Sequence, residues 1–212
     1  MVSTLWQNSQ FQWYLASVSF SGTAMAMQQL LITWLLVGIL LLPAAQVGLL
    51  QALIGLPGIA LMLWGGAVAD RSDPRSLLIQ VYSLAWMFPI GLFTAVQFEL
   101  LNVWSVGIFG LAMSTAIAYA SPSQQAILNR IAGAEVQRGV TLSTIASFVV
   151  QIVGLGISGQ MEKVGVDTVL AIQSTSLILA AFAVRQLTPA EISADSRQTT
   201  IEGLMEGFKA VL

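Results

Sequence analysis

Hydrophobic positions dominate the first third of the chain, and polar positions are confined to short breaks between long apolar segments. No charged side chain occurs in residues 1–69, and then Asp70, Arg71, Asp73 and Arg75 follow closely on one another. A helix needs about 20 mostly apolar residues to cross a bilayer, and a charged side chain at its centre costs about 2.5–3.5 kcal/mol on insertion scales. The pattern therefore predicts membrane-spanning helices, with the charges lying between them.

Six apolar segments of sufficient length can be separated in this way. The breaks between them include Pro43, the charges at 70–75 and a longer polar stretch at 124–138, which we expect to be a loop. We predict spans at 12–38, 47–69, 76–97, 101–121, 140–161 and 168–186. The expected fold class is an all-α membrane protein with six transmembrane helices in one bundle.

Composition supports this class and excludes several functions. The 212 residues are 56% hydrophobic and only 8% charged, whereas a soluble domain averages about 25% charged residues. The net charge of −2 gives no reason to expect a nucleic-acid partner. The chain has neither Cys nor His, so it lacks thiolate chemistry, the commonest metal ligand and the commonest general base. We therefore expect no cofactor, no metal, no catalytic residue and no enzyme activity.

Basic residues fall almost entirely on one side of the predicted spans. With six spans, both termini and the even-numbered loops share a side that holds Arg71, Arg75, Arg130, Arg138, Arg185, Arg197 and Lys209. The other side holds only Lys163. Because loops rich in Lys and Arg stay in the cytoplasm, we expect a protein of the plasma (inner) membrane with both termini cytoplasmic.

The last 25 residues differ in character from the rest, which divides the chain into a bundle at 1–187 and a cytoplasmic linker at 188–212. Thr199 and Glu202 fit a capping box, and apolar residues then recur at helical spacing. This pattern is typical of an amphipathic helix on the membrane surface. The alternative is that residues from Leu204 onward begin a seventh span.

The loop after the second predicted span carries the most specific motif. Residues 66–75 read Gly-Ala-Val-Ala-Asp-Arg-Ser-Asp-Pro-Arg. This loop resembles the signature loop of the major facilitator superfamily, written G-x-L-A-D-R-x-G-R-R. Asp73 stands where many members have Gly, and Pro74 stands where many have a basic residue. A branch of efflux carriers, which includes siderophore and macrolide exporters, looks similar at Asp73.

Other segments resemble the same branch. They are Val-Gly-Leu-Leu at 47–50, Ser-Pro-Ser-Gln-Gln-Ala-Ile-Leu at 121–128, and Glu-Gly-Leu at 202–204, which is similar to the start of the linker between the two halves of a carrier. The resemblance implies the first six-helix half of a twelve-helix carrier. It also implies a second six-helix half as partner, in the same longer chain or in another copy, besides the lipid bilayer and a small-molecule substrate.

The resemblance implies a conformational latch formed by Gly66, Asp70, Arg71 and Arg75. In the family the matching Asp caps a helix of the other half and pairs with nearby Arg, and such contacts hold one access state closed. Gly66 would let a neighbouring helix approach closely. The alternative is a charge cluster that only obeys the positive-inside rule, which explains the Arg residues but neither the Gly spacing nor the Asp.

Glycines recur at Gly154, Gly156 and Gly159 within the fifth predicted span. The stretch resembles the antiporter motif of the family, G-P-x-x-G-G, with Leu155 in place of Pro and Ser158 in place of one Gly. Small residues at this spacing also permit close helix packing. We expect these three glycines to serve packing.

Substrate contacts have to come from uncharged groups, because no predicted span has a clear ionisable residue at its centre. In the family, spans one and four line the central cavity, and the resemblance places Gln28, Thr115 and Tyr119 there. For each residue, hydrogen bonding between helices is an equal alternative. A neutral cavity suits an uncharged or amphipathic cargo.

These observations predict transmembrane transport of a small molecule by alternating access, with efflux as the expected direction and without any ionisable group for proton coupling inside these spans. The alternative is a degenerate half-carrier that does not transport and acts as a membrane scaffold. Pro74 and the absence of an acid in the first span favour that alternative slightly.

Overall fold

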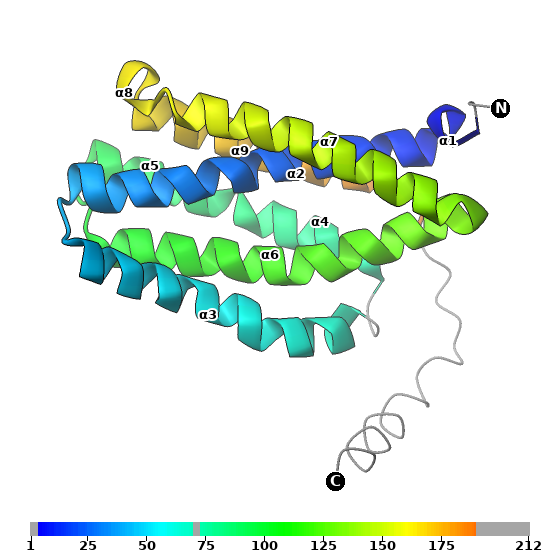
Figure 1. Ribbon diagram of the computed structural model, residues 1–212, viewed down its shortest axis with the longest axis horizontal. Helices are drawn as coiled ribbons and strands as arrows, with labels where there is room; N and C mark the ends of the chain where they lie inside the picture. Colours follow the sequence, from blue (N-terminus) through cyan, green and yellow to red (C-terminus); the bar gives the residue numbers. More distant parts are fainter. Residues whose placement is uncertain (1–3, 70–72, 190–212) are drawn as a thin grey trace, which may run out of the picture.

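The computed structural model describes residues 4–69 and 73–189, and every regular element in these ranges is a helix. In chain order they are α1 (Thr4–Gln7), α2 (Ser9–Trp34), the π-helix η1 (Leu35–Ile39), α3 (Ala44–Ala69), α4 (Pro74–Ala85), α5 (Met87–Gln97), α6 (Val103–Ala132), the 3₁₀-helix η2 (Gly133–Glu135), α7 (Val136–Ser158), α8 (Met161–Val164) and α9 (Val166–Arg185). The long helices run side by side, as Figure 1 shows.

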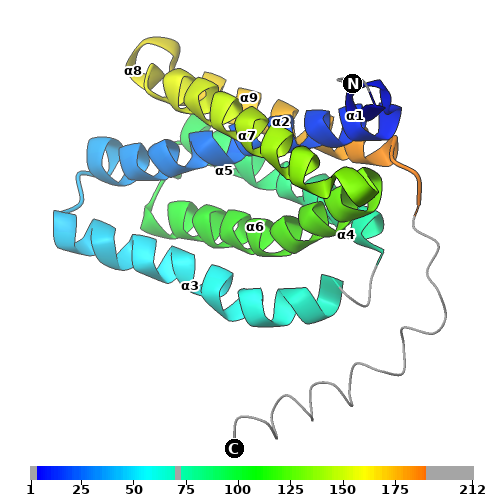
Figure 2. The same cartoon turned by 45° about the vertical axis from the view of Figure 1, so that its right-hand side comes forward.

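Helix α2 lies at the centre of the packing. It contacts α7 and α9 along much of its length and α6 more briefly, while α3 packs chiefly on α6 and lies at one edge of the bundle (Figures 1 and 2). Helices α4 and α5 contact both α6 and α9. The buried core consequently follows α2 and the start of η1, whose Phe11, Met27, Leu31 and Leu35 are fully covered by neighbouring helices.

The helix starts follow from local polar residues. The Asn8 side chain accepts a hydrogen bond from the Gln10 amide at 2.9 Å and so caps α2. At α6, Asn102 and Ser105 form a reciprocal capping box. Asp73 caps α4, and Pro74 occupies the first turn, where its missing N–H costs nothing. The two departures from the family signature at positions 73 and 74 therefore have a structural role as a helix start.

The predicted span at 76–97 is divided into two helices. Helix α4 ends at Ala85 and α5 begins at Met87, with Pro89 in its first turn. Pro89 has no N–H to donate to the carbonyl one turn earlier, which is a common cause of a helix break. The Ser174 hydroxyl of α9 donates to the Trp86 carbonyl at 2.9 Å and satisfies a backbone group at the break.

The expected loop at 124–138 is wrong for most of its length. Helix α6 continues to Ala132, η2 occupies the next three residues, and α7 begins at Val136. The polar residues in this stretch lie on helix ends, where side chains can leave the apolar environment without interrupting the backbone hydrogen bonds. The chain reverses direction at η2, so α6 and α7 run antiparallel (Figure 1).

Four helical segments are long and apolar enough to cross a membrane, judged by length and composition alone. They are Ser9–Ile39, Pro74–Gln97, Val103–Ser158 and Val166–Arg185. The third has 56 residues because α6, η2 and α7 follow without interruption. A shorter apolar helical segment, Ala44–Gly58, lies in the part of α3 whose side chains the structure describes. The fold is thus that of an integral membrane protein, and the count of six crossings remains a prediction.

Candidate functional site

Two of the three predicted cargo contacts lie in one groove of about 260 Å³ between α4 and α6. Thr115 and Tyr119 lie on successive turns of α6 and both line it. The Thr115 hydroxyl already donates to the Leu111 carbonyl at 2.8 Å, so it can offer a ligand only an acceptor. The other lining residues are apolar: Val81, Leu84, Ala85, Phe88, Ala112 and Ala116. An apolar wall with two hydroxyl groups suits a small amphipathic molecule.

Gln28, the third predicted contact, lies elsewhere. Its side chain is 6% exposed within α2, and it does not line the groove between α4 and α6. Its Oε1 atom is buried and has no hydrogen-bond partner within the described part of the chain. Burial of this amide favours a role in helix packing, and contact with cargo stays a prediction for Gln28.

A polar contact among three helices was missed by the sequence analysis. The Gln124 Nε2 of α6 donates to the Tyr82 hydroxyl of α4 at 2.7 Å and to the Ser21 hydroxyl of α2 at 3.2 Å. Gln124 was assigned to a loop, although the apolar Ile127 and Leu128 continue the helical spacing beyond it and were a usable signal. The contact fixes the relative rotation of α2, α4 and α6, of which α4 and α6 line the groove.

Helix α2 receives further side-chain hydrogen bonds from its other neighbours. Gln173 of α9 is fully buried and donates to the Ala24 carbonyl at 3.0 Å. Ser158 of α7 donates to the Met27 carbonyl at 3.4 Å. In a membrane such bonds contribute about 0.6 kcal/mol each on average. Their main effect is to specify which faces of α2 meet α7 and α9.

Four arginines belong to helix termini at the end of the bundle where α9 stops, which we call the arginine-rich end (Arg75, Arg130, Arg138 and Arg185). Arg75 of α4 donates to the Arg185 carbonyl at 2.7 Å, and Arg130 of α6 donates to the Thr188 carbonyl at 2.8 Å. The last carbonyls of a helix carry partial negative charge, so guanidinium groups stabilise this terminus.

Gln10 of α2 also holds the chain that leaves α9. Its side-chain oxygen accepts from the Thr188 amide at 2.7 Å, and its Nε2 donates to the Gln186 carbonyl at 3.5 Å. Helices α2 and α6 therefore bind the segment that follows α9, and α4 binds Arg185, the last residue of α9. The position at which the predicted linker starts is set by the same part of the bundle that carries Arg75.

The predicted latch is only partly within the described residues. Gly66 lies in the last turns of α3, and Arg75 binds the end of α9. Asp70 and Arg71 lie outside the described residues, as does the predicted helix with Thr199 and Glu202. The four latch residues are thus not seen together, and their joint role remains a prediction.

The three glycines of α7 differ in their surroundings. A Cβ atom built on Gly154 would lie 2.9 Å from the Thr23 carbonyl oxygen and 2.9 Å from the Ala26 Cβ, both on α2. A Cβ on Gly156 would meet nothing within 4 Å, and one on Gly159 would meet only carbonyls of its own helix. Close packing therefore applies to Gly154, which lies where α7 crosses α2.

Charges at the opposite end of the bundle are mostly negative. The described residues there are Glu99, Glu162 and Asp167, with Lys163 as the single base, and we call this the acidic end. Gln97 of α5 donates to Asp167 of α9 at 2.7 Å. Among the residues that the structure describes, no three Asp or Glu side chains come together as a metal site would require.

Comparison with known families gives one match that covers nearly the whole chain. The model of a family described as transmembrane secretion effector, of the major facilitator type, matches residues 4–212. No curated protein matches the chain.

Proposed function

We propose that this chain, which belongs to the transmembrane secretion effector family of the major facilitator superfamily, exports small amphipathic molecules by alternating access. Membership makes it an integral membrane protein of a transporter family. The family match over residues 4–212 is the observation that carries the proposal. The direction of transport and the mechanism are the parts that experiments have to establish.

The proposed architecture is the first six-helix half of a carrier, with both termini in the cytoplasm of a cell whose plasma membrane it spans. The reversal between α6 and α7 supports two crossings within the 56-residue segment Val103–Ser158. On this view the arginine-rich end is cytoplasmic, as the positive-inside rule requires. A second six-helix bundle, from a continuation of the chain or from another copy, completes the carrier.

The exposed apolar and polar side chains of the bundle differ in whether lipid alone can cover them. Leu49 of α3 is 63% exposed, and Ile152 and Phe148 of α7 are 71% and 62% exposed. In a membrane these residues can face lipid, but the partly exposed Thr115 and Tyr119 are better covered by another bundle than by acyl chains. A cavity between two bundles would enclose both residues, and we assign cargo contact to them.

The latch proposal gives each charged residue a distinct task. Asp70 and Arg71 would bind the second bundle in one access state and release it in the other. Arg75, which binds the Arg185 carbonyl, would connect this loop to the end of α9 and hence to the linker. A movement of the loop would then be accompanied by a movement of the linker that joins the two halves.

Export can be tested with Asp70→Asn in intact cells that express the protein together with any further sequence in its reading frame. The probe is Nile red, an uncharged amphipathic dye. We expect cells with the unaltered protein to accumulate less dye than cells without it, and Asp70→Asn to remove the difference while the amount of protein in the membrane stays the same. Glu162→Gln, a neutralised carboxylate at the acidic end, is the control that should keep export.

Two outcomes would count against the proposal. Equal dye accumulation with and without the unaltered protein would favour a scaffold that does not transport. Export that persists in Asp70→Asn would remove the latch role while leaving transport itself in place. The same assay on Tyr119→Phe and Thr115→Ala would then ask whether the groove between α4 and α6 contacts cargo.

A further inference from the structure

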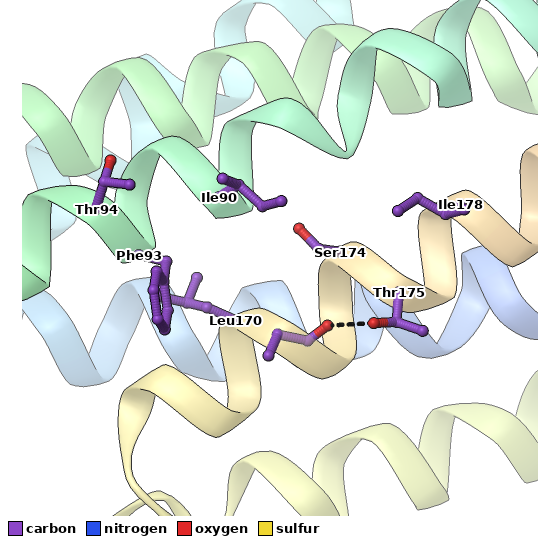
Figure 3. Close-up of a pocket in the computed structure, with 8 residues that line it drawn as sticks. Ile90, Phe93, Thr94, Leu170, Ser174, Thr175 and Ile178 are labelled. Carbon is purple, nitrogen blue, oxygen red and sulfur yellow. Dashed lines mark hydrogen bonds between the residues drawn. The ribbon is translucent and has the colours of Figure 1, made fainter.

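A second groove, of about 340 Å³, lies between α5 and α9 and is separate from the one that contains Thr115 and Tyr119. Figure 3 shows side chains of the two helices facing one another across it. Its lining residues are Ile90, Phe93, Thr94, Leu170, Ala171, Ser174, Thr175 and Ile178. Ile90 and Ile178 are 41% and 45% exposed, so the groove is open on the outside of the bundle.

The break between α4 and α5 lies beside this groove. The Trp86 carbonyl at the break binds the Ser174 hydroxyl of α9, which ties the two segments together at one point. A new helical segment, α5, begins at Met87. Its residues Ile90 and Phe93 form part of one wall of the groove. The groove is therefore bordered by the same contact that stabilises the helix break.

The three hydroxyl groups in the wall are already engaged as donors inside the protein. Thr94 donates to the Gly91 carbonyl at 2.7 Å, Thr175 donates to the Ala171 carbonyl at 2.8 Å (Figure 3), and Ser174 donates to Trp86. The surface that remains is mostly methyl, methylene and aromatic carbon. Such a wall offers no hydrogen-bond donor to a polar occupant and suits a hydrocarbon chain.

A polar pair bridges the same two helices one turn beyond the groove. Gln97 follows Thr94 on α5, Asp167 precedes Leu170 on α9, and the Gln97 amide donates to the Asp167 carboxylate at 2.7 Å. The second carboxylate oxygen of Asp167, Oδ1, is buried and has no hydrogen-bond partner within the described ranges, whereas Oδ2 accepts from Gln97 in an exposed hydrogen bond. An apolar groove thus leads to a carboxylate with unused acceptor capacity.

The surrounding charges favour a cation at this position. Asp167 belongs to the acidic end, where Glu99 and Glu162 add negative charge and Lys163 is the one base among the described residues. Phosphates without a compensating positive group would be repelled there, whereas an ammonium group would be attracted. An occupant that matches both parts of the site has a hydrocarbon chain and an ammonium group.

We propose that the groove between α5 and α9 holds one acyl chain of phosphatidylethanolamine, with the ammonium of its headgroup bound by Asp167. A phospholipid is favoured over a free amine because the groove opens on the outside of the bundle, where lipid is the solvent. An –NH₃⁺ group can donate to the carboxylate, and charge-assisted hydrogen bonds of this kind are the strong ones.

The test is native mass spectrometry of the purified full protein, loaded with equal amounts of phosphatidylethanolamine and phosphatidylglycerol that carry the same acyl chains. We expect roughly two- to fivefold more phosphatidylethanolamine to be retained, the range that a partly exposed ion pair supports. Asp167→Asn should bring the ratio close to one. Glu162→Gln removes a carboxylate that adds only longer-range charge at the same end, so it should lower the ratio much less than Asp167→Asn does.

Equal retention of the two lipids by the unaltered protein would overturn the proposal. So would a loss of preference in Glu162→Gln as large as that in Asp167→Asn, because the preference would then report general charge. Should Asp167→Asn be unstable, Ala171→Phe gives a second variant, since its ring fills the groove and should lower phosphatidylethanolamine retention with the carboxylate intact.

The identity of the occupant in the membrane can be tested separately. Benzoylphenylalanine at position 175, photoactivated in native membranes, should form an adduct with the mass of phosphatidylethanolamine. An adduct with a second copy of the chain or with another helix bundle would overturn the proposal, because protein would then cover the groove. Neither experiment measures transport, so failure here leaves the proposed export function standing, and failure of export leaves this site standing.

Discussion

Helices α2 and α3 have the same length, 26 residues, and neither contains a charged residue, yet they occupy opposite positions in the fold. Helix α2 contacts α6, α7 and α9 and has buried residues along most of its length, from Phe11 to Ile32. Helix α3 packs mainly on α6, and among its described side chains only Val47 and Ile54 are buried. Overall hydrophobicity therefore does not decide which helix forms the core.

Small and polar residues account for the difference between the two helices. Ser21 and the carbonyls of Ala24 and Met27 on α2 accept hydrogen bonds from three neighbouring helices. Lipid is as apolar as leucine, so apolar side chains alone give no preference for helix contact over lipid contact. Hydrogen bonds and close approach specify the core, and the part of α3 whose side chains the structure describes has fewer of both.

The largest effect is expected when glycine is replaced by valine at a contact with α2, and the same replacement on α3 serves as its comparison. Gly154→Val introduces atoms against the Thr23 carbonyl of α2, a backbone group that cannot turn aside. We expect a loss of about 3 kcal/mol in unfolding free energy, at the upper end for overpacking, measured by thermal unfolding in detergent. Gly55→Val on α3, where a Cβ meets nothing within 4 Å, should leave stability nearly unchanged.

The next largest effect on the unfolding free energy is expected when a leucine of each helix is replaced by alanine. Leu31 of α2 is fully buried, whereas Leu53 of α3 is 47% exposed. Leu31→Ala leaves a cavity and should lower the unfolding free energy by about 2 kcal/mol, the low end for a buried leucine. Leu53→Ala should cost less than about 0.5 kcal/mol, as surface changes do. Equal losses in the two variants would show that α3 is as tightly packed as α2.

A smaller effect is expected when only the hydrogen bonds of Gln124 are removed. Gln124→Leu removes the donor shared by Tyr82 and Ser21 and should cost about 1 kcal/mol, given about 0.6 kcal/mol for each such bond in a membrane. Gln151→Leu on α7 changes an exposed amide in the same way and serves as the matched control. If the two variants unfold at the same temperature, the contact among α2, α4 and α6 does not hold the core together.

The sequence predicted the helices more closely than their contacts. Each predicted span coincides with a helix or a pair of helices to within a few residues at most ends, because charges and prolines are placed between apolar runs. The break at Trp86 was missed, although Pro89 was visible. The end of α6 was predicted too early because polar residues such as Gln124 also occur on helix ends and at helix contacts.

The arrangement of the candidate site was harder to predict from the sequence than the helices were. Thr115 and Tyr119 are one turn apart, so their common groove follows from helical spacing, but the position of Gln28 depends on how α2 is rotated against its neighbours. The binding of the Arg185 carbonyl by Arg75 joins residues far apart in the chain, and local patterns carry no information about such a pair. The groove at α5 and α9 likewise exists only once the two helices are packed.

The central claim is that the polypeptide passes back and forth through the membrane, with the arginine-rich end in the cytoplasm and the acidic end outside. The most direct test uses single-cysteine variants, since the chain has no native cysteine to interfere. Gln137 lies in the first turn of α7, and Lys163 lies in α8, just beyond the other end of α7. With a membrane-impermeant maleimide on intact cells, we expect Lys163→Cys to be labelled at once and Gln137→Cys only after permeabilisation. Labelling of both positions from the same side would contradict the claim.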